Sequence, residues 1–212
     1  MNNQNEMPHE EGIDHSLGFL KDGYEFILKR RKELQSDIFE TRMFGMKVIC
    51  MGGSEAAELF YDTEKFQRKN VAPNRIVQTL FGKNAIQTLD GKQHRWRKQL
   101  FMSILSGEQL SNLIKLVEAQ WEIAINKWEQ KEQIVLYEEV KLLLCKAVFE
   151  WTGVPIKENQ TEEFTEELAA LYESAAKVGP KHWQGRTARN HAEQYVEDVI
   201  EGVRGGKITP PK

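Results

Sequence analysis

Apolar residues recur at spacings of three and four in the first periodic segment of the chain. This pattern extends from Ser16 to about Leu34 and predicts one amphipathic helix. The runs IFETRM and KVICM follow, and they flank Phe44-Gly45-Met46 in the manner of a β-hairpin. Gly52-Gly53 is expected to close the hairpin. Ser54 is then expected to cap a short helix that extends to Tyr61.

A long segment without periodicity separates this region from the main helical part of the chain. Residues 62–89 combine prolines, asparagines and a glycine with isolated apolar residues, which predicts an ordered loop with one helical turn. Helical periodicity then returns in five blocks, expected at residues 91–104, 108–129, 137–152, 161–176 and 186–203. The segment GPKHWQGR, residues 179–186, is expected to be a turn between the last two helices.

Five apolar residues of the helix at 137–152 are expected to be deeply buried. They are Val140, Leu143, Leu144, Ala147 and Val148. The short run at residues 133–136 predicts a strand, yet no partner for it is evident, and the hairpin alone would be marginally stable. We therefore expect a chain that is part of a larger fold, with a polar tail at residues 1–15 and a single incomplete domain at residues 16–212.

Composition narrows the classes of partner. The 212 residues are 40% hydrophobic and 29% charged, as in a globular chain, and the net charge of −3 gives no global attraction to nucleic acid or anionic membranes. The tail has no apolar core and no apolar stretch approaches a membrane span, so we expect a cytoplasmic protein without a stable membrane anchor. Cys50 and Cys145 lie in apolar runs, which predicts buried structural cysteines in a reducing compartment.

The richest candidate chemistry lies in the segment DGKQHRWRKQLF, residues 90–101. On a helix, His94, Arg97, Lys98 and Phe101 share one face, so three nitrogen-bearing side chains converge near the helix start. Such a face suits a carboxylate or phosphate, although a solvated basic face has the same pattern. A second cationic cluster occurs earlier in the segment KFQRKN, with members Lys65, Arg68 and Lys69.

Other common site motifs are missing from the sequence. The sequence contains no HExxH and no CxxC motif, so neither its five histidines nor its two cysteines suggest a metal site. It also contains no nucleotide-binding glycine motif and no GxSxG elbow. Trp183, beside His182, is expected to pack in the turn between helices. Trp121 and Trp128 are expected in the core rather than on a base-stacking surface.

The order of several motifs resembles the N-terminal half of the bacterial fatty-acid peroxygenases of the cytochrome P450 superfamily. The matching stretches are KVICMGGSEAAELFYDTEKFQRKN, LFGKNAIQTLDGKQHRWRKQLF, VPIKENQ and VGPKHWQGR, and the similarity extends from about residue 7 to residue 208. The resemblance implies a mainly α fold with small β-sheets, that is, the N-terminal portion of the haem-thiolate fold. It also implies haem b as cofactor.

The resemblance implies a role for seven residues. His94 and Lys98 match the DG-x-x-H motif and the basic residue four positions later, which bind haem propionates in the superfamily. Arg68 is a further propionate candidate, and Arg97 is either a partner or a surface residue. The remaining three match positions over the distal haem face or along the fatty-acid channel: Phe81, Gln87 and Val178. Gln87, where some relatives have histidine, favours hydroxylation over decarboxylation.

The resemblance also implies what lies outside this chain. The axial cysteine, the E-x-x-R pair and the arginine that binds the fatty-acid carboxylate belong to the C-terminal half of the family. The implied reaction is hydroxylation of a long-chain fatty acid at the α or β carbon with hydrogen peroxide, without a redox partner protein. The substrate carboxylate would serve as the acid/base for peroxide cleavage. The 212 residues alone are expected to be inactive and to expose apolar faces.

Two other classes of function compete with this interpretation. The chain would instead be a helical interaction module, with an anion-binding face at His94, Arg97 and Lys98, if it folded independently of haem. A nucleic-acid binder is the weakest alternative, because the net charge is negative.

Overall fold

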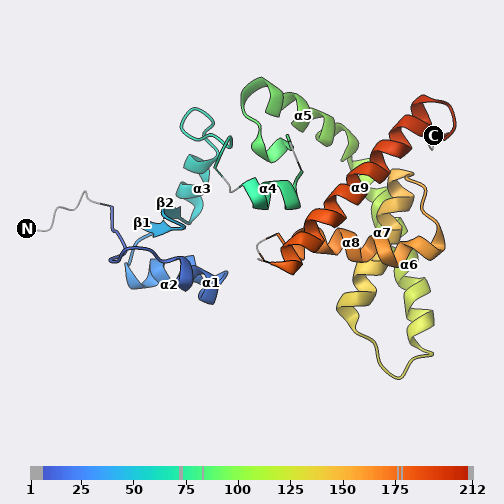
Figure 1. The fold of residues 1–212 in the computed structure, drawn as a ribbon, viewed down its shortest axis with the longest axis horizontal. Helices are drawn as coiled ribbons and strands as arrows, with labels where there is room; N and C mark the ends of the chain where they lie inside the picture. Colours follow the sequence, from blue (N-terminus) through green and yellow to red (C-terminus); the bar gives the residue numbers. More distant parts are fainter. Residues whose placement is uncertain (1–6, 72–73, 83, 176, 178, 210–212) are drawn as a thin grey trace, which may run out of the picture. The chain divides into compact units, whose positions relative to one another are not determined.

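The computed structural model describes residues 7–71, 74–82, 84–175, 177 and 179–209. The chain divides into two compact units, Met1–Gln67 and Arg68–Lys212, which are described separately. Figure 1 shows the elements of each unit. The single domain predicted for residues 16–212 stays a prediction.

The first unit begins with two helices where one was predicted. Helix α1 spans Ser16–Asp22 and helix α2 spans Glu25–Glu33. Gly23 between them has a φ of 54°, a left-handed conformation that interrupts the helical path. The prediction of one continuous helix was therefore wrong, because the apolar spacing continues across a glycine that redirects the backbone.

The predicted hairpin is confirmed. Strands β1 (Ile38–Met43) and β2 (Met46–Met51) pair antiparallel, with Phe39 opposite Cys50. The turn residues Phe44 and Gly45 have φ values of 54° and 72°, the pair of positive angles that suits a tight hairpin. On the other edge of β1, the backbone of Glu40 exchanges two 2.8 Å hydrogen bonds with the segment at residues 8–10.

The core of the first unit lies between the hairpin and α2. Its buried members are Phe26, Phe39, Met43 and Cys50. Helix α3 follows as Ser54–Phe60, with Gly53 as its N-cap residue. The expected cap by Ser54 was wrong, because Ser54 is already the first helical residue and makes no side-chain cap bond. The buried position predicted for Cys50 is confirmed.

The second unit begins with more structure than a loop. Helix α4 spans Asn74–Leu80 and a 3₁₀ turn, η1, spans Ile86–Thr88. The prediction of one helical turn in residues 62–89 therefore understated the order of this segment. The next two helices confirm their predicted positions: α5 spans Gly91–Ile104 and α6 spans Gly107–Trp128. The Ser106 hydroxyl caps α6 by accepting from the Gln109 amide.

The predicted strand at residues 133–136 was wrong. Residues 133–135 are described as irregular chain, and Leu136 already begins helix α7, Leu136–Thr152. An apolar run of four residues does not distinguish a strand from a helix start, and a strand needs a partner that this segment lacks among the described residues. Gly153, with φ 67°, ends α7 as predicted.

The last two helices differ from their predicted bounds: the first is shorter and the second is longer. After the 3₁₀ turn η2 (Glu158–Gln160), helix α8 spans Thr161–Glu173 and helix α9 spans Pro180–Arg204. The segment predicted as a turn therefore forms the first turns of α9, because Pro180 is well suited to the start of a helix. Trp183 is 70% exposed, so the expectation of a packed tryptophan was wrong.

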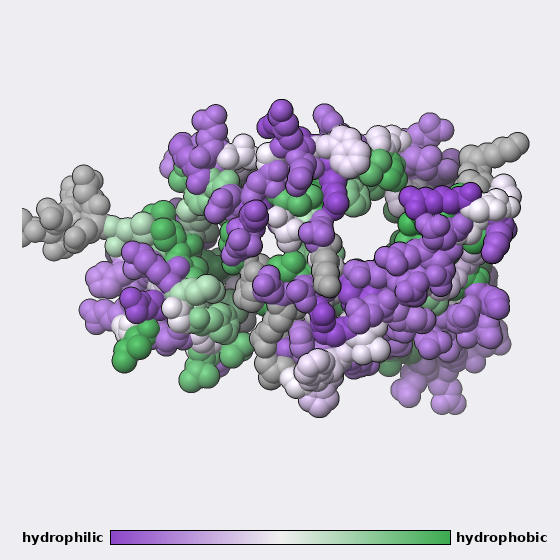
Figure 2. All heavy atoms as spheres, turned by 45° about the horizontal axis from the view of Figure 1, so that its top comes forward, coloured by the Kyte–Doolittle hydropathy of each residue, from purple (hydrophilic) through white to green (hydrophobic). Residues whose placement is uncertain are grey.

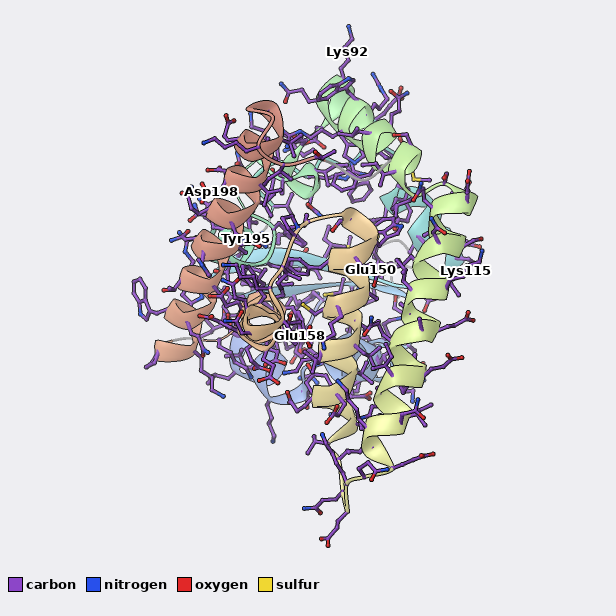
Figure 3. The ribbon with its side chains drawn as sticks, turned by 90° about the vertical axis from the view of Figure 1, so that its right-hand side faces the viewer. Lys92, Lys115, Glu150, Glu158, Tyr195 and Asp198 are labelled. Carbon is purple, nitrogen blue, oxygen red and sulfur yellow. The ribbon has the colours of Figure 1, made fainter. Side chains whose placement is uncertain are left out.

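Helices α6 to α9 pack on one another in sequence order (Figure 1). Figure 3 shows Tyr195 of α9 directed toward the neighbouring helices, while Asp198 and Lys115 point outward. The Tyr195 ring packs on Phe164 of α8 with centroids 4.5 Å apart, and its hydroxyl donates to the carbonyl of Pro155. Trp121 and Trp128 are half-buried and meet edge to face at 5.5 Å.

Burial along α7 confirms two of the five residues predicted to be buried. Leu143 and Ala147 are buried, and Cys145 is buried as expected. Leu144 and Val148 are 43% and 40% exposed, and Val140 is half-buried. Together with Tyr137 and Tyr172 they border an apolar groove of about 320 Å³ between α7 and α8. In Figure 2, hydrophobic side chains likewise reach the surface among hydrophilic ones.

The closest approach of α8 and α9 provides a test of this packing. A Cβ atom on Gly185 would collide with the Ser174 side chain and lie 3.0 Å from the Ala170 carbonyl oxygen. Gly185→Ala should therefore lower the free energy of unfolding by about 1–3 kcal/mol, measured by urea denaturation. Gly107→Ala is the control, because a Cβ there meets nothing within 4 Å. Equal stabilities of the two variants would contradict the described packing.

Candidate functional site

One carboxylate organises the start of α5. Asp90 is the N-cap residue of α5, but its side chain does not cap that helix. Instead it accepts hydrogen bonds from the backbone amides of Arg68, at 2.9 and 3.1 Å, and of Lys69, at 2.9 Å. These bonds, that of Arg68 first, hold the pKa of Asp90 below its usual value. The segment at residues 68–69 is thereby fastened to the beginning of α5.

Three of the predicted residues form a cationic cluster around this point. His94 is half-buried one turn into α5, and Lys98 follows one turn later. Burial lowers the pKa of His94, and the positive charges of Arg68 and then Lys98 lower it further, against a smaller opposite effect of Asp90. The structure thus places Arg68 and Lys98 where their charges act on His94, and we call these three residues the cationic cluster.

The cationic cluster lacks matching negative charge. Arg68 Nη1 lies 3.7 Å from Asp90 Oδ1, whereas among the described residues His94 and Lys98 have no carboxylate in ion-pair range. A guanidinium, an imidazole and an ammonium that share one nearby carboxylate favour a further anion, because each can donate a charge-assisted hydrogen bond. The arrangement therefore fits one or more carboxylate or phosphate groups.

Arg97 is directed elsewhere. Its guanidinium donates to the backbone carbonyl of Asn84, which ties α5 to the loop before η1. It is half-buried, and the structure gives it a bond within the protein rather than a place in the cationic cluster. Lys65 of the other predicted cluster pairs with Asp62 at 2.9 Å, within the first unit.

A cavity of about 660 Å³ lies beside the cationic cluster. Arg68, Phe81, Gln87 and Asp90 all line it. The side chains of Phe81 and Gln87 are exposed, Phe81 to 36%. Two of the three predicted channel residues therefore share one wall with Arg68, while Val178 lies outside the described residues.

The cavity wall depends on two residues that the sequence analysis missed. Arg186 and Arg189 of α9 bind the last turn of α4, which precedes Phe81. Their spacing of three places them on one face of a helix, and this was the available signal. A turn was predicted at residues 179–186, however, so the face was not recognised.

Metal chemistry by protein side chains finds no support in the described part of the chain. No group of three or more histidine, cysteine or acidic side chains there is placed to hold a metal ion. Cys50 and Cys145 are buried, and burial raises the pKa of both thiols, which disfavours the thiolate form. No helix in the described ranges is both long and apolar enough to cross a bilayer.

Comparisons with known proteins bear on the family and the fold of the chain. No protein-family model matches the chain. The solved structure of cytochrome P450EX alpha (CYP152N1) with myristic acid is 44% identical, with a TM-score of 0.90, and the match covers 98% of this chain and 50% of that one. Ligand-free cytochrome P450 OleT is 31% identical, with a TM-score of 0.92 and coverage of 97% and 50%.

A curated cytochrome P450 also matches the chain, at lower identity. Cytochrome P450 26A1 of Danio rerio is 26% identical over 200 residues, which are 87% of this chain and 40% of the relative. The chain spans half or less of the proteins it matches. It belongs to the cytochrome P450 superfamily, and its fold is that of the N-terminal half of the CYP152 branch. The predicted family and fold class are thereby confirmed.

The burial of His94 and its two cationic neighbours together predict a titration. The folded-state pKa of His94 lies below 6.5, so folding disfavours its protonation. The folded chain should therefore lose stability as pH falls below about 6.5 and not above it. Lys98→Met and Arg68→Met should each raise the His94 pKa, measured by NMR of the imidazole.

Lys92→Met is the matched control for this titration. Lys92 lies on the same helix but points away from it into solvent (Figure 3). Its removal should leave the His94 pKa unchanged. The proximity of the three cations would be refuted if neither Arg68→Met nor Lys98→Met moved that pKa.

Proposed function

We propose that these residues are the N-terminal half of a haem-thiolate peroxygenase that hydroxylates long-chain fatty acids. Hydroxylation would fall at the α or β carbon, with hydrogen peroxide as oxidant and without a redox partner protein. The observation that carries the proposal is the cationic cluster, in which Asp90 is the one nearby carboxylate among the described residues, together with the 660 Å³ cavity that Arg68 lines. The CYP152 structures support it, one of which was solved with myristic acid.

The residues present fit the carboxylate edge of a haem. His94 and Lys98, one helical turn apart, would donate to one propionate, and Arg68 would donate to a propionate from the segment that Asp90 holds in place. Lys98 is a point charge, so its contact is less directional than the bidentate contact an arginine would make. Arg97 would act indirectly, by holding α5 to the loop at Asn84.

The cavity residues would act on the substrate rather than on the cofactor. Phe81 offers an aromatic wall for an alkyl chain. Val178, which lies outside the described residues, is proposed as a substrate-channel residue on the family resemblance alone. Gln87 offers an amide that can hydrogen-bond without titrating. This supports the proposal of hydroxylation rather than decarboxylation. A thiolate-ligated haem, when bound, supplies the oxidising chemistry, and these residues orient the carbon chain against it.

The proposal predicts that the 212 residues alone are inactive. Neither buried cysteine can serve as axial ligand, and the arginine for the substrate carboxylate is implied only outside this chain. Myristic acid and hydrogen peroxide added to the chain with haem should give no hydroxylated product above a haem-only control. Product clearly above that control would overturn this part of the proposal.

The natural protein provides the complementary test. It should have about twice the length of this chain and show the carbon-monoxide difference band of a thiolate-ligated haem. In that protein, His94→Gln and Lys98→Met should each weaken haem binding roughly tenfold, as expected for one lost charge-assisted bond, measured as haem retained after gel filtration. Lys92→Met is the control. A 24.6 kDa natural species without haem would instead favour the helical interaction module.

A further inference from the structure

The C-terminal end of α4 is held from behind by α9. Arg189 Nε donates to the Thr79 carbonyl at 3.1 Å, and its Nη2 donates to the Leu80 carbonyl. Arg186 Nη1 donates to the Gln78 side-chain oxygen at 2.8 Å. Two arginines, one helical turn apart on α9, therefore bind three consecutive residues of α4.

This junction is tightly packed. Thr79 is completely buried and the Arg189 side chain is only 18% exposed. Gly82, which follows Phe81, has a φ of 82° and lies so close to the Glu193 carboxylate of α9 that a Cβ atom would collide with it. The end of α4 consequently has little freedom to shift relative to α9 while these contacts persist.

The residues held in this way form a wall of the cavity. Val77, Gln78, Phe81 and Gly82 line it, whereas Arg186 and Arg189 do not. The amides of Phe81 and Gly82 both donate to the Val77 carbonyl, at 2.9 and 3.1 Å, so these two residues continue the backbone path of α4. Displacement of the helix end would therefore move Phe81 within the cavity.

We propose that Arg186 and Arg189 are positioning residues that hold Phe81 at one place in the cavity wall. They thereby determine which carbon of the fatty-acid chain is oxidised. This inference rests on the function proposed above, because it assigns regioselectivity to that reaction. The planar guanidinium of Arg189 binds two successive carbonyls at once, which the single ammonium of a lysine does with less directional control. A small displacement of a bound chain is enough to change which atom reacts.

The first experiment tests the positioning without any cofactor or substrate. Hydrogen exchange of the 212-residue chain is followed by mass spectrometry in peptides that contain the Phe81 and Gly82 amides. Arg189→Ala should accelerate their exchange roughly tenfold, because two charge-assisted bonds at the helix end are lost. Arg189→Lys should restore part of the protection. Arg204→Ala, on the same helix but 72% exposed, is the control and should change nothing there.

The second experiment tests regioselectivity in the haem-loaded natural protein with myristic acid and hydrogen peroxide. Arg189→Ala should shift the ratio of α- to β-hydroxylated product roughly threefold or more, with Arg204→Ala unchanged and Arg189→Lys intermediate. Unaltered exchange in Arg189→Ala would overturn the positioning role. Altered exchange with an unaltered product ratio would overturn the role in regioselectivity. Failure of the unsubstituted protein to oxidise any fatty acid would overturn the proposed function, while accelerated exchange would still support the anchoring of α4.

Discussion

The carboxylate of Asp90 is the interaction on which the candidate site depends. By accepting the amides of Arg68 and Lys69 it fastens an irregular segment to the start of α5, and so places Arg68 beside His94 and Lys98. Burial and then the positive charges of Arg68 and Lys98 lower the pKa of His94, so a positive charge on this imidazole is unfavourable in isolation. The arrangement is understandable if the energetic cost is offset by an anion that binds there.

The second organising contact is the pair of arginines on α9. They bind α4 and do not line the cavity themselves. The two contacts have different effects. Asp90 positions the cationic side chain of Arg68, whereas Arg186 and Arg189 hold the end of α4 that lines the cavity. Asp90 and Arg189 use backbone amides or carbonyls as partners, which makes these bonds insensitive to the side chains at the positions they bind, whereas Arg186 depends on the Gln78 side chain.

Apolar side chains of α7 reach the surface of the second unit. Leu144 and Val148 lie on an open groove between α7 and α8, and the chain spans half of the solved CYP152 structures it matches. A helix whose apolar residues extend around more than one face is suited to burial between two layers. The second unit covers only one of these faces among the residues described, since Leu143, Cys145 and Ala147 are buried while Leu144 and Val148 are not.

The amino-acid sequence alone determined the local elements with strong signals and the family. The hairpin, the helices α5 to α7, the buried cysteines and the shared face of His94 and Lys98 follow from spacing, turn residues and apolar pattern, which are local properties. Tertiary structure alone decided that Gly23 breaks a helix, that Asp90 binds Arg68 and Lys69 instead of capping α5, and that α9 holds α4. The last two features depend on contacts between residues as much as 110 positions apart, which no local pattern encodes. The break at Gly23 depends on a backbone angle that the apolar spacing does not reveal.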